Sequence, residues 1–233
     1  MRVGIIGGMS WQSTLTYYQQ INEQVNARKG GLHSADLLIH SVDFQAISEW
    51  QHHDNWPALG NALAESARDL YKGGADVIVI ATNTMHKVAD KVSQATPLPL
   101  LHIVDATAKS CHRQQLTTVG LLGTRFTMEQ SFYRECLEAR GVRVITPDSE
   151  ARDAIHDIIY NKLCKGVISD ADRQTYLEIM QTLHDQGAQG MILGCTEIGM
   201  LVKQKDTAIP LIDTTAAHVT AIVESICSYQ TIA

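Results

Sequence analysis

The turn Gly194-Cys195-Thr196-Glu197 places a cysteine directly after a short apolar run, Met191-Ile192-Leu193. Such a run behind glycines is typical of a buried parallel strand, and open α/β sheets bind ligands just past the carboxyl ends of their strands. If a helix begins at Thr196, its dipole is expected to lower the pKa of the Cys195 thiol below the free value of about 8.5. Most cysteines are small buried hydrophobic residues, so a second observation is needed to single out Cys195.

An earlier segment repeats this setting. Val77-Ile78-Val79-Ile80 matches the run before Cys195, and Thr82 then falls at the position of Cys195. Two further pairs match in the same order, residues 118–124 with 2–8 and residues 209–212 with 98–101. Three matched segments in one order indicate two similarly folded halves.

Two halves related by a pseudo-twofold axis are expected to bring Thr82 and Cys195 to opposite sides of one cleft. Inverting a stereocentre next to a carboxylate requires an acid/base group on each face, because a single group returns the proton to the face it left. The pair has the geometry for that reaction. Polar residues at the same strand ends are suited to hold carboxylates and stabilise an enediolate: Ser10, Asn83, Thr84, Thr124 and Thr196.

The elements that position these residues alternate between strands and helices. A strand at Val3–Ile6 leads into the turn and helix start Gly7–Thr14, which suits a carboxylate or phosphate. This turn lacks the spacing of a dinucleotide site or a P-loop. Ser10 or Ser13 as a simple helix cap is the alternative reading.

The remaining pattern predicts a strand at 35–42, a solvated loop at 49–56 and a helix at 57–72. In the second half it predicts helices at 128–140, 151–163, 171–186 and 214–229, with a strand at 142–145. Strands separated by helices indicate parallel sheets. We therefore predict an α/β protein of two pseudo-symmetric, doubly wound domains with the active site between them: residues 1–104 with the C-terminal helix 214–233, and residues 105–213.

Composition narrows the class of protein. The 233 residues are 45% hydrophobic and 19% charged, with a net charge of −6. Without a basic stripe, nucleic acid is not an expected partner. No apolar run reaches membrane-spanning length, and the N-terminus lacks a signal-peptide pattern. Five cysteines without a C-x-x-C pair fit the reducing cytoplasm better than disulfides or a zinc site.

Three blocks carry a resemblance: Gly7–Thr14, Asn83–His86 and Gly194–Glu197. They resemble the signature blocks of the aspartate/glutamate racemase family, which is independent of pyridoxal phosphate. The resemblance covers nearly the whole chain. It implies two doubly wound domains, a cysteine pair that exchanges the α-proton of an acidic amino acid, a homodimer, and no metal or organic cofactor.

The chain departs from this pattern at Thr82, where the family usually has cysteine. A hydroxyl is a far weaker acid than a thiol, so Thr82 is a poor resting base, although it can relay a proton. The resemblance assigns the second-half cysteine to the L-enantiomer. We therefore hypothesise that Cys195 abstracts the α-proton of L-aspartate or L-glutamate and that Thr82 serves the opposite face.

The resemblance also suggests residues that bind the substrate. Lys165 is a candidate cation for the side-chain carboxylate, or an ordinary solvated lysine at a helix end. Gln51 is a candidate hydrogen-bond donor to the same carboxylate. Glu197 either orients Cys195 or simply occupies the first turn of a helix. The full expected set is Met9, Ser10, Gln51, Asn83, Thr84, Met85, Thr124, Lys165 and Thr196.

Two rival functions remain open, the first of them because only one cysteine of the pair is present. The same fold with a single thiol could decarboxylate a dicarboxylate or catalyse its cis-trans isomerisation. The other rival is a protein that binds a dicarboxylate without catalysis, against which the presence of Cys195 argues.

Overall fold

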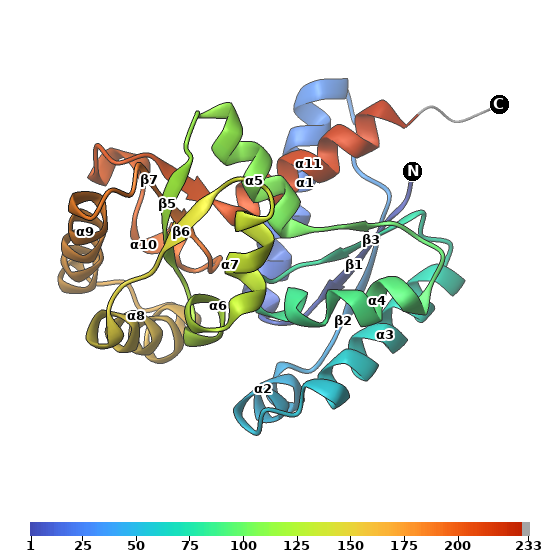
Figure 1. The fold of residues 1–233 in the computed structure, drawn as a ribbon. Helices are drawn as coiled ribbons and strands as arrows, with labels where there is room; N and C mark the ends of the chain where they lie inside the picture. Colours follow the sequence, from blue (N-terminus) through green and yellow to red (C-terminus); the bar gives the residue numbers. More distant parts are fainter. Residues whose placement is uncertain (230–233) are drawn as a thin grey trace. The chain divides into compact units, whose positions relative to one another are not determined.

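Each half of the sequence repeat forms its own four-stranded parallel sheet (Figure 1). The computed structural model describes residues 1–229. These divide into a first unit, Met1–Ile103 with the segment that begins at His218, and a second unit, Val104–Ala217. The predicted α/β class with two parallel sheets is confirmed. The predicted domain limits, 1–104 with 214–233 and 105–213, stay a prediction.

The two sheets share one strand order. The first is ordered β2-β1-β3-β4 and the second β6-β5-β7-β8. Their strands are β1 Val3–Gly7, β2 Leu37–Ser41, β3 Val77–Ile80, β4 Leu100–Leu101, β5 Thr118–Leu122, β6 Arg143–Ile145, β7 Gly190–Leu193 and β8 Leu211–Asp213. In both units the first strand lies between the second and the third, so the repeat seen in the sequence is also a structural repeat.

Helices cover both faces of the first sheet. They are α1 Trp11–Lys29, α2 Phe44–His52, α3 Trp56–Lys72, η1 Thr84–Val88, α4 Ala89–Ala95 and α11 Thr214–Ser228. Ile6 and Ile80 pack against α3 on one face, whereas Ile5 and Val79 pack against α1 and α11 on the other. Side chains alternate along a strand, and strands buried on both faces explain the continuous apolar runs in the sequence.

The second sheet is enclosed by its own helices: α5 Ile103–Arg113, α6 Arg125–Glu129, α7 Ser131–Glu138, α8 Ser149–Asn161, η2 Leu163–Lys165, α9 Asp170–Asp185, α10 Ile198–Leu201 and η3 Gln204–Asp206. Leu122 and Leu193 share one hydrophobic cluster with residues of α8 and α9. These two strands end where the candidate residues of this unit begin.

Two sequence predictions about elements were wrong. The first half of the expected loop at 49–56 is the end of helix α2. This helix forms because Asp43 caps its start by accepting a hydrogen bond from the Gln45 amide at 3.1 Å and because Ile47 packs into the core. The expected helix at 128–140 is two helices, α6 and α7. Gln130 between them has an extended backbone, with φ −80° and ψ 142°, which interrupts the helical path.

Within the described residues, every helix is too short or too polar to cross a lipid bilayer.

Candidate active site

Thr82 and Cys195 occupy equivalent positions in the two units. The last paired residue of β3 is Ile80, opposite Ile6, and that of β7 is Leu193, opposite Leu122. Each candidate is therefore the second residue past the end of its strand. The intervening amides match as well. Ala81 N–H donates to the Ile6 carbonyl at 2.9 Å, and Gly194 N–H donates to the Leu122 carbonyl at 2.6 Å.

The Cys195 thiol donates to a carboxylate. Its Sγ lies 2.9 Å from Oε2 of Glu197, and the same oxygen accepts the hydroxyl of Thr196 at 2.6 Å. Glu197 is buried and Cys195 is partly buried. The sequence predicts a carboxylate in the first turn of a helix, and the structure gives that carboxylate a direct contact with the thiol.

The predicted direction of the Cys195 pKa was wrong. Burial is the largest effect, and the charge of Glu197 is the next, and together they raise the pKa of the Cys195 thiol well above its ordinary value. The helix expected at Thr196 begins only at Ile198 and contains four residues. A short helix that starts beyond Glu197 does not offset burial beside a carboxylate, so the resting group is a thiol.

Two further side chains of the second unit, those of Tyr160 and Cys164, lie near the Cys195 thiol. Burial raises the pKa of Tyr160, and the charges of Cys195 and Glu197 raise it further. Burial together with Glu197 raises the pKa of the Cys164 thiol to about 12. Tyr160 was missed in the sequence because nothing in its local pattern distinguishes it from a core residue of α8. Both groups therefore remain protonated at neutral pH.

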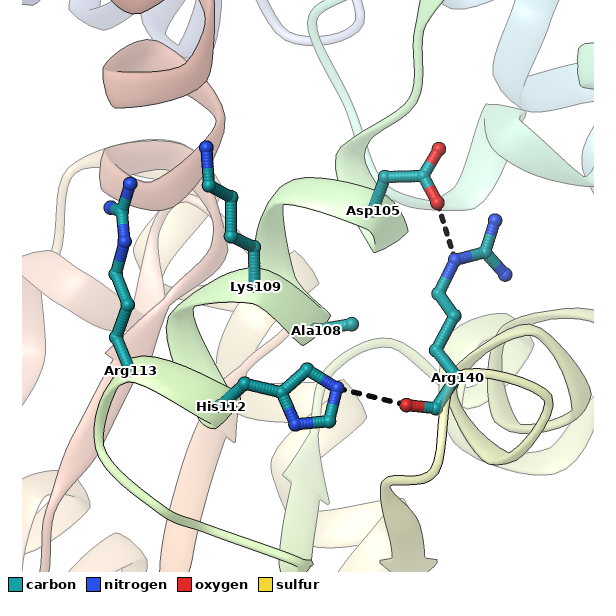
Figure 2. A pocket seen from close by; sticks show the side chains of 6 residues that line it. All are labelled: Asp105, Ala108, Lys109, His112, Arg113 and Arg140. Carbon is teal, nitrogen blue, oxygen red and sulfur yellow. Dashed lines mark hydrogen bonds and ion pairs between the residues drawn. The ribbon is translucent and has the colours of Figure 1, made fainter.

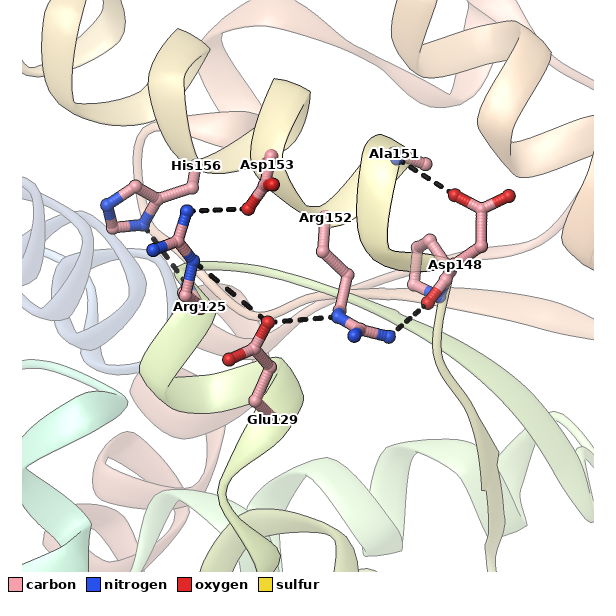
Figure 3. Close-up of polar contacts among 8 residues, drawn as sticks. Arg125, Glu129, Asp148, Ala151, Arg152, Asp153 and His156 are labelled. Carbon is pink, nitrogen blue, oxygen red and sulfur yellow. Dashed lines mark hydrogen bonds and ion pairs between the residues drawn. The ribbon is translucent and has the colours of Figure 1, made fainter.

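Thr124 begins α6 at the end of β5, and contacts with α8 hold the segment that follows it (Figure 3). Arg125 N–H donates to Nδ1 of His156 at 3.2 Å, and the Arg125 guanidinium pairs with Asp153 at 2.5 Å. Glu129 pairs with Arg152 at 3.1 Å. These bonds join α6 to α8 and fix the direction in which the chain leaves β5.

Lys165 is exposed in η2, the turn that follows α8. This turn packs beside α10, and Gly166 closes it with φ 76°, a value that favours glycine. Lys165 is therefore on the same side of the unit as the segment that follows Cys195.

The backbone around Thr82 is held by two side chains. Ser13 Oγ donates to the Ala81 carbonyl at 2.9 Å, and His86 Nδ1 lies 2.8 Å from the Thr82 carbonyl. Ile103 N–H donates to His86 Nε2 at 3.2 Å. Because Nε2 accepts, Nδ1 carries the proton and donates to Thr82.

His86 is buried, and its imidazole holds the Thr82 carbonyl. Burial lowers the pKa of His86 well below its ordinary value, and the adjacent His102 and His218 lower it further. The imidazole is therefore neutral. In the sequence, His86 follows Thr82 by four residues, which is about one helical turn, and this spacing could have predicted the contact.

The turn after β1 is built around Thr14. Its Oγ1 accepts the Gly8 amide at 2.7 Å and donates to the Ser10 carbonyl at 3.0 Å. Ser10 Oγ accepts the Ser13 amide at 3.2 Å, so the predicted capping role of Ser10 is confirmed. Gly8 has φ 89°, and a Cβ at this position would collide with the Val42 carbonyl oxygen. The turn thus requires glycine.

Gln51 and Met85 are in contact inside the first unit. Gln51 Nε2 lies 3.2 Å from Met85 Sδ, and Met9 packs in the same cluster as Met85. Gln51 is only 4% exposed, yet its Oε1 has no hydrogen-bond partner among the residues that the structure describes. Buried amide oxygens are nearly always paired, so this atom is a candidate acceptor for a hydrogen bond from a ligand.

The family model for Asp/Glu/Hydantoin racemases matches residues 6–222. The chain belongs to this family. It is therefore an enzyme of a racemase family. It is 27% identical to the broad specificity amino-acid racemase RacX of Bacillus subtilis, over 98% of this chain and 99% of that protein.

Two solved structures resemble the racemase closely. One is a candidate Asp/Glu racemase from Yersinia pestis, 49% identical, with a TM-score of 0.92 over 97% of this chain and 99% of that one. The other is an aspartate racemase homologue from Pyrococcus horikoshii, 30% identical, with a TM-score of 0.85 over the same shares of the two chains.

The predicted site residues of the racemase fall into two sets, one in each unit. The first unit holds Met9, Ser10, Gln51, Thr82, Asn83, Thr84 and Met85, and the second holds Thr124, Lys165, Cys195 and Thr196. In each unit these residues lie after the strands, apart from Gln51 on α2 and Lys165 on η2. Among the described residues, no group of three or more His, Cys, Asp or Glu side chains is arranged to hold a metal ion.

A surface hollow of about 670 Å³ on α5 is a separate feature of the second unit (Figure 2). Arg140 pairs there with Asp105, and His112 Nε2 lies 2.9 Å from the Arg140 carbonyl. The residues that line the hollow include none of the predicted site residues. Its contacts attach the end of α7 to α5.

Proposed function

We propose that the protein racemises an acidic amino acid, aspartate or glutamate, with Cys195 acting on the L-enantiomer and Thr82 on the opposite face of the α-carbon. The observation that supports this most directly is the contact of the Cys195 thiol with the Glu197 carboxylate at the end of β7. A racemase family and relatives named for amino-acid and aspartate racemisation support the substrate class.

The proposed reaction begins with transfer of the thiol proton from Cys195 to Glu197. The resulting thiolate takes the α-proton of the L-substrate, and the electron pair of the C–H bond moves into the carboxylate to form an enediolate. The Thr82 hydroxyl then gives a proton to the other face of the same carbon, and a water molecule reprotonates Thr82. The hydroxide so formed is neutralised by the proton that Glu197 releases to solvent, which returns both residues to their starting state. Two groups on opposite faces are what stereochemical inversion requires.

Glu197 makes this assignment feasible despite the raised pKa of Cys195. The thiol is the wrong protonation state for a base, but a carboxylate 2.9 Å away can accept its proton when the substrate arrives. In the reverse direction Thr82 is the weaker base, so its hydroxyl also needs a proton acceptor, for which water is proposed.

The substrate is proposed to be held by the polar residues of both units. Gln51 Oε1 is buried without a hydrogen-bond partner among the described residues and suits the α-ammonium group. Rotation of its amide would present the NH₂ to a carboxylate instead. Lys165 is proposed to pair with the distal carboxylate. The other proposed contacts are Met9, Ser10, Asn83, Thr84, Met85, Thr124 and Thr196.

The family resemblance also motivates proposals about the working enzyme. We propose that it acts without pyridoxal phosphate or a metal ion, in the cytoplasm, as a homodimer. Its role is in amino-acid metabolism.

Incubation of the protein with each enantiomer in deuterated water tests the two roles separately. The wild type is expected to exchange the α-hydrogen of both enantiomers, and Cys195→Ala to lose exchange from the L-form. Thr82→Val is expected to keep exchange from the L-form while losing formation of the D-product. Exchange from the L-form that survives in Cys195→Ala would refute the role of Cys195.

The presence of threonine at position 82 favours one alternative, a single-thiol reaction such as decarboxylation or cis-trans isomerisation of a dicarboxylate. Chiral chromatography after incubation with L-aspartate, L-glutamate or maleate separates these reactions. Formation of the D-amino acid supports racemisation, whereas fumarate from maleate supports isomerisation.

A protein that binds a dicarboxylate without catalysis is the remaining alternative. It predicts that the wild type shows no catalytic activity with any of these substrates and that the Cys195→Ala variant binds the ligand with unchanged affinity. Calorimetric titration of both proteins with aspartate and glutamate measures that affinity.

A further inference from the structure

Helix α1 exposes a row of large apolar side chains on one flank. Trp11, Leu15 and Tyr18 are 64%, 54% and 51% exposed, and their spacing places them in one stripe along the helix. Ile39 of β2 is 40% exposed. We call these four side chains the edge surface.

The stripe lies on the flank of α1 that faces β2. One and two turns beyond Tyr18, Asn22 accepts the Ala35 amide at 2.9 Å, and Asn26 donates to the His33 carbonyl at 3.2 Å. Both contacts attach this flank to the segment that leads into β2. Ile39 is on the α1 face of the sheet, because it alternates with Leu38 and shares its face with Leu37, which packs against the α1 cluster.

β2 is the outermost strand of its sheet. Its neighbour β1 is buried along its whole length, whereas β2 has no fully buried residue. Parallel sheets normally have both faces covered, and exposed edges are usually protected by lysine, proline or a covering segment. On the face of β2 that carries Ile39, α1 is the only helix of the described residues that the edge surface includes.

The edge surface also lacks charge. No Lys, Arg, Asp or Glu occurs in residues 11–22 or 37–42, although the whole chain carries a net charge of −6. The carboxylates that flank these segments have partners within the chain. Asp36 pairs with Arg2 at 2.9 Å, Asp43 accepts the Gln45 amide at 3.1 Å, and Glu23 accepts a hydrogen bond from Gln19 Nε2 at 2.7 Å. Two copies of this chain repel one another overall, and on this surface they can approach without placing like charges face to face.

We propose that a second copy of the chain docks on the edge surface about a twofold axis, so that α1 and the rim of β2 of one copy cover the same elements of the other. This rests on the homodimer proposed above and names its surface. A twofold interface uses the same patch on both subunits, and an uncharged patch is compatible with itself. Trp and Tyr are also among the residues enriched at the centres of such interfaces.

The size of the patch fits the core of an interface. A specific interface covers roughly 800 Å² on each partner. Four partly exposed side chains supply less area than this, so they form only the centre of the interface. The exposed polar neighbours Gln19 and Ser41 provide the surrounding rim. The stripe starts at Trp11, directly after Ser10, so docking also covers the chain next to the turn that follows β1.

Sedimentation equilibrium of the intact protein tests this surface. The wild type is expected at twice the chain mass of 25.6 kDa. The double variant Leu15→Glu with Tyr18→Glu is expected to raise the dimer dissociation constant at least about 100-fold, because each charge enters the interface twice. Ile39→Lys, made separately, should act in the same direction. Val167→Glu, an equally exposed apolar site in the second unit, should leave the mass unchanged.

Circular dichroism and the urea midpoint confirm that each variant is folded. A wild type that is monomeric at every concentration overturns the dimer and the surface together. A dimer that persists in both the double variant and Ile39→Lys overturns the surface alone. Racemisation is measured separately, so failure of the proposed reaction does not affect either outcome.

Discussion

Cys195 and Glu197 are joined by a hydrogen bond from Sγ to Oε2 of 2.9 Å. The bond holds a protonated thiol beside its own proton acceptor. This contact has two opposing effects, since the carboxylate raises the pKa of the thiol and also offers the path by which the thiol loses its proton.

Substitution of Glu197 by Gln separates these effects. With the charge removed, the pKa of Cys195 is expected to fall, because Glu197 raises it. The pH midpoint of alkylation by iodoacetamide should therefore move to lower pH. Turnover should nevertheless fall by about 10²- to 10³-fold, because the proton acceptor is lost, while KM changes little. Glu150→Gln, in the first turn of α8, is the control. Faster turnover in Glu197→Gln would show that the carboxylate only suppresses the thiolate.

Substitution of Gln51 by Leu is expected to raise the free energy of unfolding and to weaken substrate binding. The buried Oε1 lacks a partner among the described residues, and removing such an atom is expected to stabilise the fold by about 1 kcal/mol. KM should rise several-fold if Oε1 binds substrate. Urea unfolding and steady-state kinetics measure the two effects. Gln45→Leu, exposed on the same helix, should alter neither. A lower unfolding free energy with unchanged KM would contradict a ligand role.

His86 should make the protein less stable in mild acid. Its native pKa lies well below the ordinary imidazole value, so the unfolded chain binds more protons once the pH falls below about 6.5. Stability is therefore complete above that pH and declines below it, by up to about 1.4 kcal/mol per pH unit for this residue. Urea unfolding between about pH 7 and pH 5 should show a flatter profile for His86→Asn. Parallel profiles in the two proteins would assign the decline to other groups.

Substitution of Gly8 by Ala should destabilise the protein by about 3 kcal/mol or more, because the new Cβ collides with the Val42 carbonyl oxygen and φ is 89°. Gly30→Ala is the matched control. Its φ is 74°, but nothing lies within 4 Å of the added Cβ, so a loss of about 1 kcal/mol is expected. Chemical denaturation measures both values. Equal losses would mean that backbone strain alone requires Gly8.

Several features were readable from the sequence because they depend on local pattern. The apolar runs before Thr82 and Cys195 predicted buried strands, and the repeat predicted two similar sheets. The structure confirms both, with one strand order in the two units. Burial on both faces of a parallel strand leaves a continuous apolar run, so this information is present in the linear sequence.

Other features were decided by tertiary contacts. Helix α2 forms in a polar segment because Ile47 reaches the core and Asp43 caps the first turn. The thiol pKa of Cys195 rises because burial and one carboxylate act together, and His86 becomes a neutral brace because Ile103 donates to it from elsewhere in the chain. Local sequence therefore determined which segments form strands and where reactive side chains follow them. Folding determined the protonation of those side chains, because pKa depends on burial and on neighbours that are brought together only in three dimensions.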